Sequence, residues 1–200
     1  MTQIKICGLS RPADIQIINR VRPEYIGFVF ARNSKRKVSP EQAARLRAQL
    51  DARICPVGVF VNETVEAVAA LVKAGTVQAV QLHGQEDETY IARLRETIEI
   101  PIIQAFLIQN TQNIEAARRS TADYILLDSR CAGSGTSFDW SLIQEMDRPY
   151  FLAGGLSPDN VREALALKPF AVDVSSGVET AGVKDAGKIQ AFVEQVRKER

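Results

Sequence analysis

Residues Tyr124–Trp140, with the sequence YILLDSRCAGSGTSFDW, join an apolar run, a carboxylate and a glycine-bearing loop. The run from Tyr124 to Leu127 predicts a short buried strand that ends at Asp128, and Phe138 opens a predicted helix. A charged group held where a rigid strand meets a loop is typical of a functional side chain. Most aspartates at strand ends, however, cap or close a turn. This stretch alone leaves both interpretations of Asp128 open.

The same order, an apolar run followed by a helix-like segment, occurs eight times along the chain. The predicted strands lie at residues 4–7, 25–30, 56–60, 79–82, 101–105, 124–127, 150–153 and 171–174. Short continuous apolar runs are typical of strands buried on both faces of a parallel sheet, and alternation with helices indicates βαβ units. Eight units predict an α/β fold, a (β/α)8 TIM barrel forming a single domain over residues 1–200. An open doubly wound sheet also alternates, but no GxGxxG motif follows the first strand.

Local signals place several helix starts between these strands. Ser39 is a candidate N-cap before Pro40, and Gln42 is placed to complete a capping box. Asn62 is a candidate N-cap after the third strand. Further helices are predicted from Ser157 to about residue 167 and over about residues 185–197.

Composition narrows the classes of function. The net charge is +1, with lysine and arginine spread throughout, so we expect neither nucleic acid nor a membrane surface as a partner. No apolar run reaches the roughly 18 residues of a membrane span. The three cysteines, Cys7, Cys55 and Cys131, are an odd number at no metal-ligand spacing. Free thiols, and the lack of a signal-peptide pattern, predict a cytoplasmic protein.

Glycines and serines follow the last two predicted strands. In a (β/α)8 barrel the active site lies at the C-terminal ends of the strands, and phosphate is often bound after strands seven and eight. Gly154-Gly155 would let the backbone approach a ligand, and Ser176-Gly177 offers amide and hydroxyl donors beside it. The alternative is that these glycines only permit tight turns. Their occurrence on neighbouring strands favours a phosphate-bearing small molecule.

Cys7 and Asp128 end the first and sixth predicted strands, so they could face one ligand from two sides. A thiolate can accept a carbon-bound proton and a carboxylic acid can donate one, as an aldose-to-ketose shift requires. The alternative for Cys7 is a small buried apolar residue.

Two further polar residues follow predicted strands. Arg36, after the second strand, could clamp a substrate carboxylate in bidentate fashion, or it could belong to a solvated basic loop. His83, the only histidine, follows the fourth strand and could be a hydrogen-bonding residue of the pocket or a structural one. Alone it cannot form a metal site.

Motifs along nearly the whole chain carry a family resemblance. In order they are KICG, GFVF followed by SKR, VGVFVN, VQLHG, LLDS followed by GSGTSFDW, LAGGL, and DVSSGVE with a later KD. Together they resemble the phosphoribosylanthranilate isomerases of tryptophan biosynthesis. The resemblance implies an enzyme that converts N-(5-phosphoribosyl)anthranilate to 1-(2-carboxyphenylamino)-1-deoxy-D-ribulose 5-phosphate by an Amadori rearrangement. It implies no cofactor or metal, and it leaves monomer and homodimer open.

The resemblance also implies residue roles. Cys7 would remove the proton from C2′ of the ribose, and Asp128 would protonate the furanose ring oxygen. Arg36 would meet the anthranilate carboxylate, and the phosphate would sit on Gly154, Gly155, Ser176 and Gly177. Two positions depart from the family pattern: Ala132 replaces a usual glycine, and residues 179–184 are one residue shorter and lack a proline.

Two rival functions are weighed against this one. A ketol isomerase of the histidine pathway would have an aspartate at the end of strand one, where this chain has Cys7. A non-catalytic barrel that binds a phosphate ligand would have no need of both Cys7 and Asp128.

Overall fold

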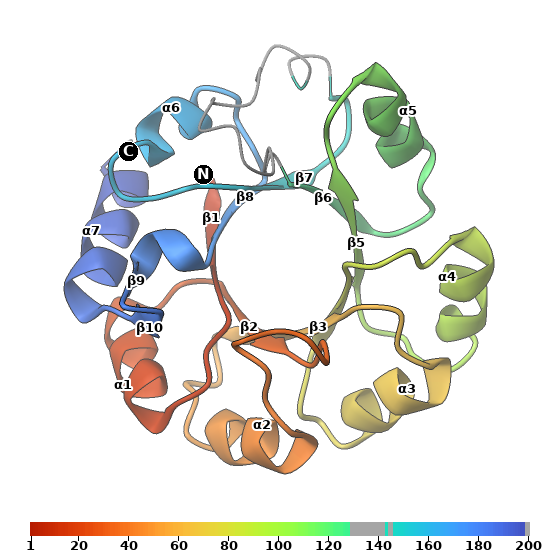
Figure 1. The fold of residues 1–200 in the computed structure, drawn as a ribbon, viewed down its shortest axis with the longest axis horizontal. Coiled ribbons are helices and arrows are strands. Elements are labelled where there is room, and N and C mark those ends of the chain that lie inside the picture. The colour runs from red at the N-terminus through yellow and green to blue at the C-terminus, as the bar shows by residue number, and fades with distance from the viewer. Residues whose placement is uncertain (129–142, 144–145, 199–200) are drawn as a thin grey trace.

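The computed structural model describes residues 1–128, 143 and 146–198. Eight parallel strands close into a barrel in chain order (Figure 1). They are β1 (Gln3–Cys7), β2 (Tyr25–Val29), β3 (Cys55–Phe60), β4 (Ala79–Leu82), β5 (Ile102–Leu107), β6 (Tyr124–Asp128), β7 (Tyr150–Ala153) and β8 (Ala171–Val174). Gln3 pairs with Ala171, so β1 joins β8 and closes the ring. The predicted (β/α)8 barrel is confirmed.

The helices form an outer ring around the strands (Figure 1). They are α1 (Pro12–Val21), α2 (Pro40–Arg47), α3 (Val65–Lys73), α4 (Glu88–Arg95), α5 (Thr111–Arg119), α6 (Val161–Leu165) and α7 (Ala186–Arg197). The predicted helix start at Phe138, the loop Gly133-Ser134-Gly135 and Cys131 lie outside the described residues.

Side chains that alternate along the strands pack into two hydrophobic cores, one between the strands and the helices and one inside the barrel. On β1, Ile4 and Ile6 pack in the large cluster between strands and helices. A second cluster, containing Val57, Leu126 and Phe151, fills the barrel interior. Rings of Tyr25, Tyr124, Phe151 and Phe170 lie against one another there, with centroids 4.8–5.8 Å apart. Tyr25 and Tyr124 begin their strands, so aromatic packing closes the end of the barrel opposite the C-terminal strand ends.

The predicted start of α2 at Ser39 and Pro40 is confirmed, but its capping box and two other predicted helix starts need correction. The oxygen of Ser39 caps α2 by accepting from the Gln42 amide at 3.1 Å, but the Gln42 side chain donates to the Ser10 carbonyl and completes no capping box. Thr64, not Asn62, caps α3. Asn62 instead has a φ of 50°, a conformation that asparagine tolerates in turns, and its side-chain oxygen accepts from the Gln85 backbone amide of the next loop.

The third correction concerns the segment after β7. Ser157 does not begin the helix directly: residues 158–160 form a turn, and α6 starts at Val161. The Ser157 hydroxyl oxygen accepts from the Asp159 amide at 3.2 Å, and the Asn160 side chain accepts from the Ser157 amide at 2.9 Å, so a turn initiated by serine leads into α6.

A short hairpin follows β8, where no strand was predicted. A 3-10 turn, η2 (Ser176–Val178), leads into β9 (Glu179–Thr180), which pairs antiparallel with β10 (Val183–Lys184). Ala181 and Gly182 form its two-residue loop with φ values of 52° and 77°. Positive φ at both positions is typical of a tight hairpin turn, so the shortened segment forms a compact hairpin.

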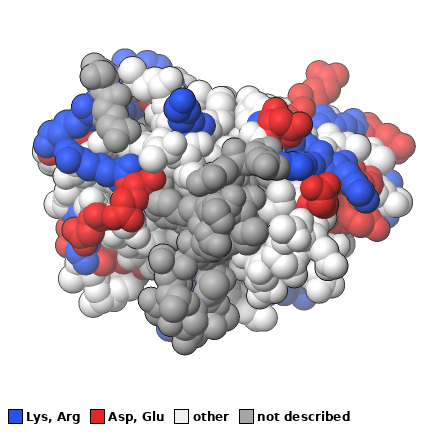
Figure 2. Space-filling model, turned by 90° about the horizontal axis from the view of Figure 1, so that it is seen from above, with Lys and Arg blue, Asp and Glu red and all other residues white. Residues whose placement is uncertain are grey.

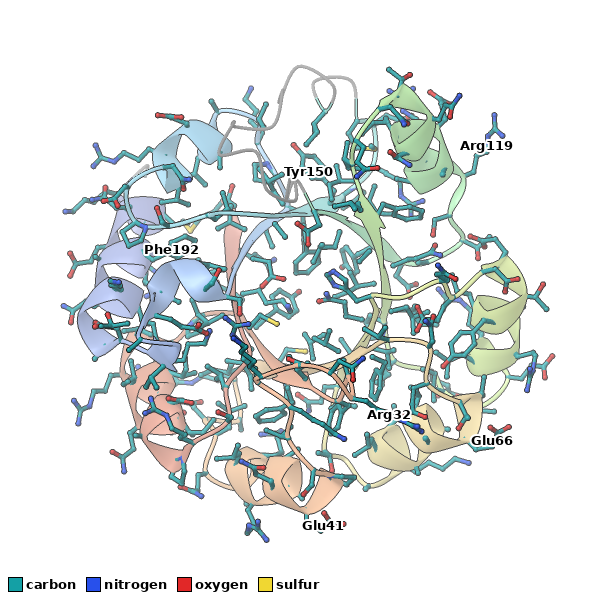
Figure 3. All side chains as sticks on the ribbon, in the orientation of Figure 1. Arg32, Glu41, Glu66, Arg119, Tyr150 and Phe192 are labelled. Atoms are coloured by element: carbon teal, nitrogen blue, oxygen red, sulfur yellow. The ribbon has the colours of Figure 1, made fainter. Side chains whose placement is uncertain are left out.

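Charged side chains cover the outside of the helix ring. Figure 3 shows Glu41 of α2, Glu66 of α3 and Arg119 of α5 at its outer edge. On the face drawn in Figure 2, basic and acidic residues are interspersed. Among the described residues, no helix combines the length and apolar character needed to cross a bilayer.

Candidate active site

A cavity of about 240 Å³ opens at the C-terminal ends of the barrel strands. Seven of the eight predicted site residues line it: Cys7, Arg36, His83, Asp128, Gly154, Gly155 and Ser176. Cys7 is the last residue of β1 and Asp128 the last residue of β6. The barrel thus brings together side chains that lie far apart in the sequence.

Gly177 is the predicted site residue that the cavity lining lacks. A Cβ atom at this position would lie 1.8 Å from the Leu156 carbonyl oxygen, so only glycine fits. Its role in the structure is to let η2 pack against the loop after β7. Gly154 and Gly155, in contrast, line the cavity with positive φ values of 101° and 63°, a conformation that favours glycine.

Cys7 shares the inner face of β1 with Lys5, whose side chain is fully buried. Lys5 Nζ donates to Asp173 Oδ2 of β8 at 2.8 Å, and this pairing is what makes a buried ammonium tolerable. Asp173 lines the cavity, and its Oδ1 atom accepts no hydrogen bond from the described residues. Sequence reasoning missed both residues, although a charge inside an apolar strand was the signal that could have found them.

Burial raises the pKa of the Cys7 thiol above its ordinary value. Lys5 and Lys184 favour the thiolate and act in the opposite direction, without outweighing burial. The thiol is therefore the main species of Cys7 at neutral pH. When the thiolate forms, its raised pKa makes it a stronger base.

Asp128 is buried and lies beside His83. His83 Nε2 is 3.5 Å from Asp128 Oδ2, and His83 Nδ1 is 2.7 Å from Gln81 Nε2. If the Gln81 amide donates to Nδ1, the neutral imidazole carries its proton on Nε2, facing the carboxylate. The structure thus places His83 in the pocket, with its Nε2 atom next to the Asp128 carboxylate. Gln81 also lines the cavity, and it was not among the predicted site residues.

Arg36 lines the cavity and is engaged by an acidic partner within the chain. Its Nε and Nη2 atoms donate to Oε1 and Oε2 of Glu179, each at 2.6 Å. Burial acts to raise the pKa of Glu179, but hydrogen bonds from Arg36 and Lys184 outweigh it and lower the pKa to about 2. Arg36 is therefore not part of a simple solvated loop. Its partner Glu179 could not be found from sequence, because 143 residues separate the two.

Over the described part of the chain, no group of three or more His, Cys, Asp or Glu side chains could hold a metal ion. The functional groups that line the cavity are a thiol, carboxylates, an imidazole, a guanidinium and the backbone of two glycines. Such a set can move protons and bind anionic groups.

Comparison with known proteins agrees with this geometry. The family model of N-(5'-phosphoribosyl)anthranilate (PRA) isomerase matches residues 4–195. The isomerase of Endomicrobium trichonymphae is 46% identical over 202 residues, covering 98% of this chain and 99% of that protein. The isomerase of Acetivibrio thermocellus is 44% identical over 211 residues, covering 98% and 96%.

Solved structures give the same result. The crystal structure of the isomerase from Thermotoga maritima has a TM-score of 0.90 and 39% identity, covering 99% of this chain and all of that one. A structure of such an isomerase in complex with reduced 1-(o-carboxyphenylamino)-1-deoxyribulose 5-phosphate has a TM-score of 0.87 and 38% identity, with the same coverage. These matches support the first of the functions weighed from the sequence. The chain belongs to the phosphoribosylanthranilate isomerase family.

Proposed function

We propose that this chain isomerises N-(5-phosphoribosyl)anthranilate with Cys7 as the general base and Asp128 as the general acid. One observation carries the assignment of roles: the last residues of β1 and β6, a thiol and a carboxylic acid, line one cavity at the C-terminal face of the barrel. In (β/α)8 barrels the active site lies at that face.

The two groups fit the two proton transfers of an Amadori rearrangement. Protonation of the furanose ring oxygen by Asp128 breaks the bond from that oxygen to C1′, and the amine nitrogen lone pair forms a C1′=N bond. The Cys7 thiolate then takes the proton from C2′, and the electron pair of that C–H bond forms an enolamine. Protonation at C1′ and loss of the C2′ hydroxyl proton give the ketone. Each transfer needs only a positioned acid or base.

The other residues that line the cavity match the phosphate and the carboxylate of this substrate. Backbone groups of Gly154 and Gly155, with Ser176, suit the phosphate. A guanidinium at Arg36 suits the anthranilate carboxylate, because a planar fork matches a carboxylate in bidentate geometry. His83, beside Asp128, would orient that carboxyl group through its Nε2 proton. The phosphate assignment for Gly177 rests on the sequence resemblance.

Several broader expectations remain proposals. A single domain over residues 1–200 and the absence of a nucleic-acid partner are expected from the sequence, and turnover without metal or cofactor is implied by the family resemblance. A cytoplasmic location is supported by the free thiols of Cys7 and Cys55. The isomerase of Thermotoga maritima is dimeric, which keeps both monomer and homodimer open for this chain.

Complementation tests the function. A bacterial strain that lacks phosphoribosylanthranilate isomerase should grow without tryptophan when it expresses this chain. Growth should be lost with Cys7→Ala and with Asp128→Asn, and it should be kept with Cys55→Ser, a thiol at the start of β3 and outside the cavity lining. Failure of the wild-type chain to restore growth, with soluble protein present, would refute the function. Growth with Cys7→Ala would refute the base.

A further inference from the structure

The guanidinium of Arg36 is held by a carboxylate from the other end of the chain. Glu179, the first residue of β9, accepts from Nε and Nη2 of Arg36 at 2.6 Å each, and its side chain is only 6% exposed. This fork uses one edge of the guanidinium. Five N–H donors belong to the group, so those on Nη1 and the second on Nη2 lie outside the fork.

Glu179 is itself held in place from the hairpin. Lys184 pairs with it across β9 and β10, and Lys184 Nζ donates to Glu179 Oε1 at 2.6 Å. The same ammonium donates to the Ser175 carbonyl at 2.9 Å, and the Ser175 hydroxyl donates to the Cys7 carbonyl at 3.1 Å. A continuous set of hydrogen bonds therefore fixes the carboxylate relative to the end of β1.

The aliphatic part of Arg36 is confined as well. A Cβ atom at Gly8, the residue after Cys7, would lie 2.4 Å from Arg36 Cδ. The stem of Arg36 therefore crosses the backbone at Gly8, in space that any other residue would fill. The stem of Arg36 thus lies on Gly8 and its fork on Glu179, so contacts at both ends hold the guanidinium at the rim of the cavity.

From this arrangement we propose that Glu179 is a positioning residue that makes ligand binding selective for a carboxylate. It occupies the Nε edge of Arg36 and so presents the Nη1–Nη2 edge to the carboxylate of the substrate. A second carboxylate can bind that edge in bidentate fashion. Fixing the guanidinium beforehand removes the entropy cost of ordering a long side chain when the ligand binds. The inference rests on the proposed contact between Arg36 and the substrate.

Binding of two matched ligands tests the inference without turnover. The probes are reduced 1-(o-carboxyphenylamino)-1-deoxyribulose 5-phosphate and the same compound with phenyl in place of carboxyphenyl, titrated calorimetrically. In Glu179→Gln we expect roughly 10- to 100-fold weaker binding of the carboxylated ligand, the range for a hydrogen bond to a charged group. Binding of the phenyl ligand should stay within about twofold of wild type. Glu41→Gln, on the outer helix ring, should leave both affinities unchanged.

Comparison with Arg36→Ala separates this inference from the proposed function. If Arg36→Ala weakens the carboxylated ligand selectively and Glu179→Gln weakens neither, the positioning role is wrong and the contact with Arg36 stands. If Arg36→Ala does not weaken the carboxylated ligand more than the phenyl ligand, the contact between Arg36 and the substrate carboxylate and the positioning role of Glu179 are both wrong. Equal weakening of both ligands in Glu179→Gln would indicate a merely structural role and overturn the inference. Should Glu179→Gln fail to fold, Glu179→Asp keeps the charge with a shorter reach and should give a smaller loss of the same selectivity.

Discussion

Cys7 ends a strand whose inner face also carries a buried ion pair, and the lysine of this pair moderates the effect of burial on the pKa of the Cys7 thiol. The fully buried Lys5 is joined to Asp173 at 2.8 Å. Burial raises the pKa of Cys7, and Lys5 limits that rise by favouring the thiolate. A base inside this barrel thus depends on a cation two residues away on the same strand.

Replacing that cation should make the thiol less acidic. In Lys5→Met we expect the pKa of Cys7 to rise further, because burial remains and the favourable charge is lost. The rate of alkylation by iodoacetamide, measured against pH, should inflect at a higher pH than in wild type. Both proteins should carry Cys55→Ser and Cys131→Ser so that a single thiol reacts. An unchanged or lower inflection in folded protein would contradict this role of Lys5.

Sequence reasoning reached the residues at strand ends but not their partners. Cys7, Asp128 and His83 were found because the end of a strand can be located from its apolar run. The pairing of Lys5 with Asp173 could not be found, because it depends on the contact between β1 and β8. Two residues 168 apart become neighbours only when the barrel closes.

At the scale of elements, the hairpin β9–β10 matters most for the site. Through Glu179 it is tied to the loop after β2, and through Lys184 to the end of β8. The hairpin escaped prediction because its strands are only two residues long and carry no apolar run. The N-cap of α3 also differed from the prediction: Asn62 and Thr64 are both acceptable N-caps by residue type, but Thr64 caps the helix and Asn62 accepts from the Gln85 amide instead.

Low pH should weaken the ion pairs that Glu179 makes with Arg36 and Lys184. The pKa of Glu179 is lowered to about 2 from an ordinary value of 4.5, so its carboxylate stabilises the fold above pH 4.5. That stabilisation is lost as the pH falls from 4.5 toward 2. Urea unfolding at several pH values should therefore show a smaller loss of stability in Glu179→Gln than in wild type over this range. Glu66→Gln, on the outer helix ring, is the control and should follow wild type. Parallel curves for all three proteins would contradict the assignment.

At the scale of the whole molecule, the number and order of elements predicted the fold. Eight apolar runs alternating with helices gave the closed parallel barrel, and the position of each strand end then placed seven of eight candidate residues at one cavity. Gly177 is the exception, because a glycine needed for close packing has the same sequence signal as a glycine needed by a ligand. The segment that first suggested a functional Asp128 continues into residues outside the described structure.

The barrel places its aromatic core and its proposed catalytic residues at opposite ends. Aromatic rings around Phe151 fill one end of the interior, and the cavity with Cys7 and Asp128 lies at the other. Removing a proton-transfer group at the cavity should therefore affect the chemical step far more than the fold.

The central claim, that Cys7 takes the C2′ proton, is tested most directly by single-turnover kinetics. Excess enzyme is mixed with N-(5-phosphoribosyl)anthranilate bearing hydrogen or deuterium at C2′, and the loss of substrate fluorescence is followed. Wild type should react more slowly with the deuterated substrate, and Cys7→Ser should react roughly 10²–10⁴-fold more slowly than wild type, the usual contribution of a general base. Cys55→Ser should match wild type. A Cys7→Ser variant that turns over at the wild-type rate would contradict the claim.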